Sequence, residues 1–305
     1  MARKKRPLKF WKGLPPKDFS IGLGQARLSD ELRHNCRIKE YPQGFIEVLS
    51  ASRPIFREPG WEPAERWEKG SRIIKPEADV PADDEVKKAD NIARAVRRAK
   101  QNLRDLALCN DMAYFVTLTL DPALVDRYDM VEITKRLNVW CSNQVQRNGL
   151  AYVLVPERHK DGAVHFHGFV NKAVEVVDSG TISVPWDKKP RRPTNEAQRN
   201  EWLAKGGKIV YNLPAWPLGF TTAIEMYGDP VAAVNYCCKY IGKQQGSGEL
   251  PEKIGGRWFY HGGCHGRPKV TYADIDFEEM ELADGAFVWE VPAAGVLFAK
   301  EKINL

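Results

Sequence analysis

The stretch Val164-His165-Phe166-His167-Gly168-Phe169-Val170 combines β-branched and aromatic residues with two histidines, a composition typical of a β-strand. Side chains alternate between the two faces of a strand, so His165 and His167 lie on one face and Phe166 on the other. We therefore expect Phe166 to point into a hydrophobic core while the two imidazoles project together. Two neighbouring imidazoles on a rigid strand provide half of a metal site.

A second strand is predicted just upstream, at Ala151–Val155, and the pair forms a hairpin. The connection His159-Lys160-Asp161-Gly162 contains Asp-Gly, which is a strong turn signal. This hairpin places Glu157, at the end of the first strand, opposite the two histidines. Two imidazoles and one carboxylate make a three-ligand metal site with open positions for water or a phosphate oxygen. Taken alone, Glu157 would be read as a surface carboxylate near Arg158 and Lys160.

The rest of the chain mixes helical and strand patterns, which indicates an α+β fold with a central antiparallel β-sheet and flanking helices. Apolar residues recur every three or four positions in the helices and form short apolar runs in the strands. We predict helices at Asp83–Cys109, Met130–Arg147, Asn195–Lys205 and Val231–Lys243, and further strands at Tyr114–Leu120, Lys208–Tyr211 and Gly219–Met226.

The segment Tyr236-Cys237-Cys238-Lys239-Tyr240-Ile241-Gly242-Lys243 carries two tyrosines, each followed three residues later by a lysine. On a helix, Tyr236 and Tyr240 share one face, and Lys239 and Lys243 share an adjacent stripe. Aromatic residues four apart are usually core packing. Buried phenols need polar partners, however, so two phenols beside two lysines are less typical of a core.

These motifs together resemble the HUH endonucleases, which start rolling-circle replication of plasmids and single-stranded DNA phages. The resemblance rests on His-Phe-His-Gly at 165–168, on the strand that ends in Glu157 and on the downstream Tyr-x-x-Lys-Tyr-x-x-Lys. Phe115-Val116-Thr117-Leu118-Thr119 is similar to the hydrophobic strand that forms the family's first motif. The paired tyrosines resemble the two-tyrosine initiators of microviruses, and the similarity covers about Tyr114–Lys243.

The resemblance implies an RRM-like sheet and a site- and strand-specific activity that nicks and rejoins single-stranded DNA. Such an enzyme initiates and terminates rolling-circle replication of a phage or plasmid. The sequence contains no GxxxxGK[ST] phosphate-binding loop, so a host helicase is expected to unwind the duplex. A host polymerase would extend the free 3′ end.

The resemblance also implies roles for individual residues. A divalent ion, Mn²⁺ or Mg²⁺, would be held by His165, His167 and Glu157. Tyr236 or Tyr240 would attack the scissile phosphate to give a 5′-phosphotyrosine, with Lys239 and Lys243 stabilising the charge.

Other functions remain open on the sequence alone. A transposase or a relaxase would use the same chemistry, although the main relaxases place the tyrosine before the histidines. A catalytically inactive origin-binding protein and a structural metal protein are the alternatives from other classes. His261, Cys264 and His265 are close enough in sequence for a structural zinc site, but no fourth ligand is apparent.

We expect three regions along the chain. Residues 1–80 contain many prolines and several tryptophans and are predicted to form an irregular, basic N-terminal arm. Residues 81–268 are predicted to form the endonuclease domain, with an insertion at about 171–212. Residues 269–305 are predicted to form an acidic C-terminal extension with short strands.

The net charge is +6, and the basic residues cluster before residue 270, which favours a polyanion such as nucleic acid as the partner. Single-stranded or hairpin origin DNA is the expected ligand. The candidate DNA-binding residues are Arg94, Arg97, Arg98, Lys188, Lys189, Arg191, Arg192, Arg257 and Arg267.

Composition also bears on location. The apolar runs fall well short of the ~20 residues that a membrane-spanning helix needs. The basic start at Met1–Arg6 is not followed by an apolar segment, so no secretory signal is visible. The six cysteines lack a CxxC pair, which is typical of reduced thiols. We expect a cytoplasmic protein without membrane contact, most simply a monomer.

Overall fold

The computed structural model describes residues 34–56, 84–187, 189–243, 250–280, 282, 285–291 and 296–304. The chain forms two compact units, one of residues 1–80 with 268–305 and one of residues 81–267. The described residues form antiparallel sheets and helices, which confirms the predicted α+β class. Lys188 and the ranges 1–33 and 57–83 of the expected N-terminal arm lie outside the described residues.

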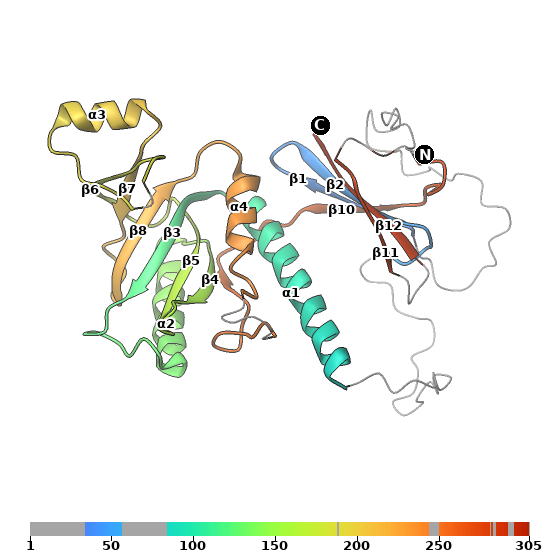
Figure 1. The fold of residues 1–305 in the computed structure, drawn as a ribbon, viewed down its shortest axis with the longest axis horizontal. Coiled ribbons are helices and arrows are strands. Elements are labelled where there is room, and N and C mark those ends of the chain that lie inside the picture. Colours follow the sequence, from blue (N-terminus) through green and yellow to red (C-terminus); the bar gives the residue numbers. More distant parts are fainter. Residues whose placement is uncertain are drawn as a thin grey trace. The chain divides into compact units, whose positions relative to one another are not determined.

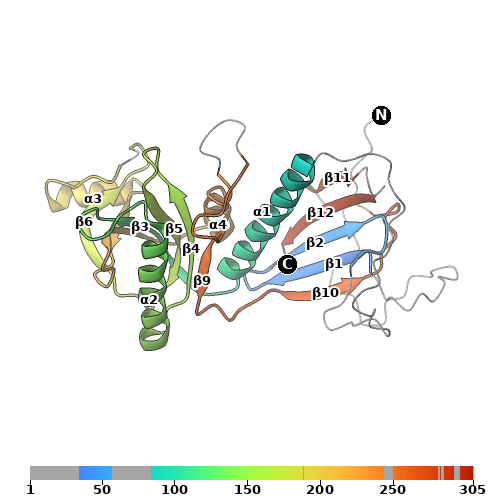
Figure 2. The same cartoon turned by 90° about the horizontal axis from the view of Figure 1, so that it is seen from below.

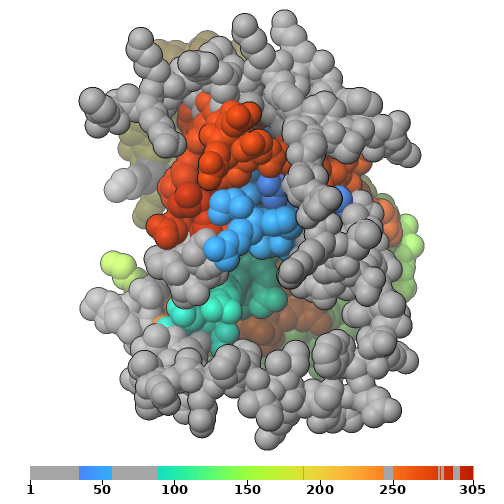
Figure 3. All heavy atoms as spheres, turned by 90° about the vertical axis from the view of Figure 1, so that its right-hand side faces the viewer, coloured from blue at the N-terminus to red at the C-terminus, as the bar shows by residue number. Residues whose placement is uncertain are grey.

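The first unit holds a five-stranded antiparallel sheet (Figure 3). Its strand order is β10-β1-β2-β12-β11. The bounds are β1 (Cys36–Tyr41), β2 (Phe45–Ala51), β10 (Lys269–Ala273), β11 (Phe287–Val291) and β12 (Val296–Asn304).

This sheet differs from the irregular arm expected for residues 1–80, because residues 36–51 form two paired strands. Cys36, Ile38, Ile46 and Val48 are buried in its core. The C-terminal strands β10 and β12 flank this pair, so the two ends of the chain share one sheet. Short strands whose partners lie at the far end of the chain leave only a weak local pattern, and the prolines around them dominate the sequence signal.

The second unit holds a seven-stranded antiparallel sheet with the order β6-β7-β8-β3-β5-β4-β9 (Figure 1). Its strands are β3 (Met112–Leu120), β4 (Tyr152–Arg158), β5 (Val164–Asn171), β6 (Val177–Ser183), β7 (Lys208–Asn212), β8 (Gly219–Glu225) and β9 (Tyr260–Gly262). Its helices are α1 (Asp84–Leu108), α2 (Met130–Asn148), α3 (Glu196–Ala204) and α4 (Pro230–Cys238). The region 171–212, expected as an insertion, supplies the edge strands β6 and β7.

Helix α2 lies along one face of this sheet (Figure 2). Asp129 caps its start by accepting hydrogen bonds from the backbone N–H groups of Val131 and Glu132, and Gly149 ends it with a φ of 70°. The core between helix and sheet contains Ile133, Leu137, Trp140, Leu118, Leu154 and Phe166. Burial of each large apolar side chain contributes about 1.5–3 kcal/mol.

Because strand residues alternate, the residues next to these core positions point to the opposite face of the sheet. Helices α4 and α1 pack together near that face, and the Tyr236 ring of α4 reaches the Phe115 ring of β3 at 6.0 Å. Among the described helices, none has both the length and the apolar character needed to cross a membrane. All six cysteines are free.

Candidate active site

The β4–β5 hairpin positions three metal-ligating side chains on the sheet face away from α2. Glu157 lies directly opposite His165, and Val155 lies opposite His167. Phe166, between the histidines, is fully buried against the α2 side. Gly168 lets the strands approach, because a Cβ there would lie 1.9 Å from the Val153 carbonyl oxygen of β4. The alternation of the His-Phe-His-Gly segment therefore separates a core anchor from two ligands.

The three ligand atoms converge on one point. The Nε2 atoms of His165 and His167 are 2.7 Å apart, and each is 3.0 Å from Oε2 of Glu157. Glu157 and His165 are 8% and 4% exposed, so the group is largely shielded from water. Among the residues that the structure describes, this is the group of three or more such side chains with metal-binding geometry.

These groups fit a divalent metal ion. Each offers a lone pair toward the same point, and two imidazole nitrogens this close need a shared proton or a shared cation. Two imidazoles with one carboxylate suit Mn²⁺ and related divalent ions. The structure thus brings together the three residues that the sequence suggested as ligands.

The ligand His167 has a polar partner behind it. Its Nδ1 atom is 3.0 Å from Oγ1 of Thr117 on β3, the strand next to β5. Such a contact sets the orientation of the ring and leaves Nε2 to face the ligand position. The Nδ1 atom of His165 is buried without a hydrogen-bond partner among the described residues. Thr117 was not identified as a site residue from the sequence, because its role depends on which strand lies beside β5.

Thr117→Val tests this support, since valine keeps the shape of the side chain and removes the hydroxyl. We expect Mn²⁺ affinity, measured by isothermal titration calorimetry, to fall about 10- to 100-fold. Thr119→Val is the matched control, because Thr119 lies on the same face of β3 two residues further along. Equal affinity in the two variants would show that the hydroxyl does not orient His167.

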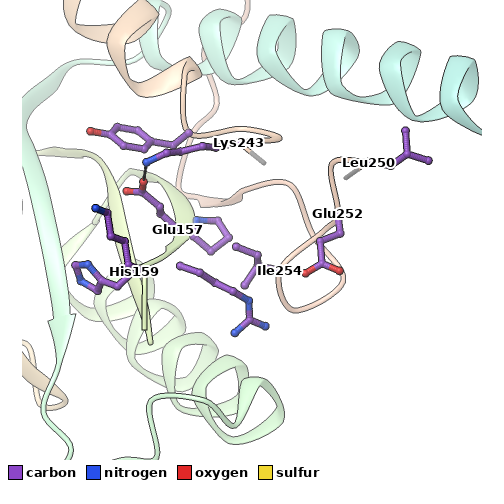
Figure 4. A pocket seen from close by; sticks show the side chains of 10 residues that line it. Glu157, His159, Lys243, Leu250, Glu252 and Ile254 are labelled. Carbon is purple, nitrogen blue, oxygen red and sulfur yellow. Dashed lines mark hydrogen bonds and ion pairs between the residues drawn. The ribbon is translucent and has the colours of Figure 1, made fainter. Parts of the chain in front are cut away.

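Lys243 compensates the charge of Glu157 (Figure 4). Its ammonium group forms an ion pair with Oε1 of Glu157, while Oε2 faces the histidines. Burial favours the neutral form of this carboxyl, but hydrogen bonds from His165, His167 and Lys243 outweigh burial and hold the pKa of Glu157 well below its ordinary value. Glu157 is therefore an anion, as a metal ligand must be.

The tyrosines lie at the end of α4. Asp229 caps this helix through the backbone N–H of Val231, and Pro230 occupies its first turn. The helix ends at Cys238, earlier than the expected Lys243, and Gly242 has a φ of 71°. Beyond the helix the backbone N–H of Tyr240 bonds to the carbonyl of Cys237, a tighter three-residue spacing. The glycine and this tightened turn stop the helix early.

The two phenols nevertheless meet. The Tyr240 hydroxyl donates a hydrogen bond of 2.6 Å to the Tyr236 oxygen, and the Tyr240 ring stacks on the His167 ring with centroids 4.4 Å apart. Burial and the bond to Tyr236 raise the pKa of Tyr240. Tyr236 is 49% exposed. One tyrosine thus touches a metal ligand, and the other presents its hydroxyl beside it.

Each lysine lies near its tyrosine, as the spacing suggested. The Lys239 ammonium is 5.5 Å from the centroid of the Tyr236 ring, and that of Lys243 is 5.8 Å from the Tyr240 ring. Both cations are therefore placed where they favour negative charge on a phenol oxygen or on a bound phosphate.

A cavity of about 880 Å³ opens beside the ligands. Glu157 and His159 of the hairpin, Lys243 and the segment 250–254 line it (Figure 4). The His159 ring stacks on His165 with centroids 3.8 Å apart. Partial burial and the neighbouring His165 lower the pKa of His159. The sequence marked this residue only as part of a turn, and its place directly after the Glu157 strand is the signal that could have identified it.

The candidate DNA-binding residues do not form one cluster. Arg94, Arg97 and Arg98 are exposed on α1, while Lys188 lies outside the described residues. In the 188–192 loop, Arg191 forms an ion pair with Asp187, and Arg192 bonds to the Ser179 carbonyl. Lys189 is exposed in the same loop. Arg267 donates to the carbonyls of Cys264 and Gly266, and Arg257 lies 5.7 Å from the Tyr260 ring.

The glycine-rich segment around Cys264 has a packing role. A Cβ on Gly263 would lie 2.0 Å from the Leu150 carbonyl oxygen, and one on Gly266 would lie 1.7 Å from that of Cys109. The buried Cys264 thiol approaches the Tyr152 carbonyl oxygen at 3.5 Å. In the described part of the chain these residues join no metal-ligating group of three. The glycines allow close contact with β4 and the end of α1.

Comparison with known proteins adds one relation. Residues 113–245, which contain the ligands and both tyrosines, match the ORF2 family of replication-associated proteins. Neither curated proteins nor solved structures include a significant match to the chain. The family match covers less than half of the chain and supports, for this region, a rolling-circle replication protein of the Rep type.

Proposed function

We propose that this protein nicks and rejoins single-stranded DNA at a replication origin through a 5′-phosphotyrosine. The observation that carries the proposal is the contact between two chemical groups: His167 belongs to the metal-ligating triad, and its ring stacks on Tyr240. A phosphate-activating site and a nucleophile are thus adjacent. The match to replication-associated proteins supplies the biological setting.

His165, His167 and Glu157 would hold a divalent ion, with Mn²⁺ or Mg²⁺ as the candidates. When bound, such an ion supplies positive charge that polarises the scissile phosphate. The chain itself supplies the nucleophile, the neighbouring cations and the positions of the DNA.

In the proposed step, a phenol oxygen of Tyr236 or Tyr240 forms a bond to phosphorus, and the bond from phosphorus to the 3′ oxygen breaks. The phenol proton leaves to solvent, and the departing 3′ oxygen takes up a proton. One phosphodiester replaces another, so the reverse attack by a 3′-hydroxyl rejoins the strand. Lys239 and Lys243 stabilise the charge that develops near the phenols.

Two adjacent phenols allow two successive cleavages. While one tyrosine remains esterified to the 5′ end, the second can attack a regenerated origin, and the free 3′-hydroxyl then closes the circle. The 2.6 Å bond between the hydroxyls brings both within reach of one phosphate position. Priming and unwinding would involve the host polymerase and helicase.

An exposed aromatic residue lies at the level of the site across the sheet. Glu157, His165, Thr119 and Phe220 are directly opposite one another on β4, β5, β3 and β8. They therefore share one face, and Phe220 is 66% exposed there. Two strand spacings separate it from His165, about 10 Å. We infer that a base next to the scissile phosphate stacks on Phe220.

Phe220→Ala should weaken binding of a single-stranded oligonucleotide about tenfold, because one base–aromatic contact contributes ~1–3 kcal/mol. Phe220→Trp keeps an aromatic surface and should bind as the native protein does. Fluorescence anisotropy in EDTA measures this without cleavage. Equal binding by the alanine and tryptophan variants would refute the stacking contact.

The test of the function is formation of a covalent adduct. The protein is mixed with Mn²⁺ and a labelled library of single-stranded and hairpin oligonucleotides and then run on a denaturing gel. We expect a shifted, label-bearing protein band that disappears in EDTA. Specific binding without an adduct would instead favour an inactive origin-binding protein, and absence of both would reject the proposal.

A further inference from the structure

A second groove lies in the same unit, between α1 and the segment 253–261, with a volume of about 550 Å³. Its lining residues differ from those of the cavity beside Glu157. Arg98 lines one side, and Lys253, Arg257 and Phe259 line the other. Two arginines that are far apart in the sequence thus meet in one place, together with a lysine that the sequence did not single out.

The local structure explains how these side chains come together. Ala95, Arg98 and Ala99 are three and four residues apart and share one face of α1, and the small alanines leave room above the helix. On the other side, Ile254 and Arg257 pair across a tight turn. Gly255 and Gly256 within it have φ values of 62° and 73°, as a type I′ turn requires. Lys253 and Arg257 therefore flank a rigid turn.

The groove is strongly positive. Arg98, Lys253 and Arg257 are exposed, and none of them makes an ion pair with a described residue. The described lining residues include no carboxylate. His261 also lines the groove, and partial burial together with Arg267 and Arg257 lowers its pKa. The lining thus favours an anionic ligand.

We propose that this groove binds the sugar-phosphate backbone of single-stranded nucleic acid, with a base against Phe259, as a contact separate from the reactive site. Cations beside an aromatic ring fit a nucleic-acid strand, whereas an acidic peptide would use the cations alone. The choice of nucleic acid rests on the proposed function. Every lining residue lies outside the 113–245 region that matches the replication-associated family.

The segment 252–254 connects the two places. Glu252 and Ile254 line the cavity beside Glu157, and Lys253 between them lines the groove. A strand that leaves the reactive site over this segment reaches the groove directly. The groove would therefore hold the flanking part of the origin while the metal ligands and tyrosines act on one phosphate.

The experiment measures binding of a fluorescent single strand, and of a hairpin with the same flank, by anisotropy in EDTA over a range of salt. Arg98→Gln/Lys253→Gln/Arg257→Gln is compared with a control of equal charge change, Lys135→Gln/Arg147→Gln/Lys172→Gln, at exposed positions outside the groove. For the groove variant we expect at least tenfold weaker binding at low salt. Its slope of log K against log salt should be smaller by about 2, at ~0.7 per lost phosphate contact.

Phe259→Leu should weaken oligonucleotide binding about tenfold and leave binding of poly-L-glutamate unchanged. Thermal melting establishes that each variant is folded. The inference is overturned if the groove variant matches the control, or if it loses poly-L-glutamate while retaining DNA. Adduct formation on a short oligonucleotide tests the proposed function separately, and the groove variant should retain it at saturating substrate. Loss confined to the hairpin would place a duplex stem in the groove and would also overturn the single-strand assignment.

Discussion

His165→Ala is expected to abolish metal-dependent cleavage, with a rate decrease on the order of a thousandfold or more. A metal ion contributes several kcal/mol to the stabilisation of charge in the transition state, and each 1.36 kcal/mol is a factor of ten in rate. His165 is largely buried and lies 3.0 Å from Glu157. Its loss removes one of three ligands and leaves the others without their common centre.

Three measurements check this prediction. Calorimetry should detect Mn²⁺ binding to the native protein and none to the variant at the same concentrations. Native protein in EDTA should show the same loss of cleavage. Mn²⁺ at a hundredfold excess over its Kd should stabilise the native protein by about 2.7 kcal/mol and leave the melting of the variant unchanged. His265→Ala, an exposed histidine outside the site, is the control. Cleavage that survives in folded His165→Ala would place the site elsewhere.

The second large effect is expected from the tyrosines. Tyr236→Phe and Tyr240→Phe should each still form the covalent adduct, and the double variant should form none. Phenylalanine keeps the ring, so the contacts with Phe115 and His167 remain, and only the hydroxyls and their 2.6 Å hydrogen bond are lost. Loss of reaction would therefore reflect chemistry and not packing.

The single variants also separate one cleavage from two. Each should nick the origin but release few closed circles, because the second transfer needs the other hydroxyl. Denaturing gels measure the adduct, and a circularisation assay measures the second transfer. Tyr227→Phe, at an exposed tyrosine after β8, should behave as the native protein does. An adduct in the double variant would exclude both residues as the nucleophile.

Element types were largely predictable from the sequence, because they depend on local periodicity. The helix predicted at Met130–Arg147 is Met130–Asn148, and the strand predicted at Tyr114–Leu120 is Met112–Leu120. Partnerships between distant strands were not predictable. β2 and β12 come from opposite ends of the chain, and neither strand carries information about the other in its own residues.

The same division applies to the site. The position of Glu157 opposite His165 follows from a short hairpin with an Asp-Gly turn, so local sequence was sufficient. Thr117 and Phe220 depend on β3 and β8 being neighbours of β5, which no local pattern indicates. The early end of α4 was missed because the tyrosine and lysine spacing suggested a continuous helix, although Gly242 takes a left-handed conformation.

The alignment of Phe220 with the metal ligands has a consequence for engineering. Backbone hydrogen bonds fix the grid on which these side chains sit. An aromatic residue moved to position 221 would face Leu118 on the core side, whereas one at 222 would keep the face and lie opposite Thr117. The shift from 220 to 222 is about 6.8 Å along the strand. The distance between the stacked base and the cut can thus be redesigned only in discrete steps of two residues, and a graded series of side-chain sizes at 220 cannot tune it continuously.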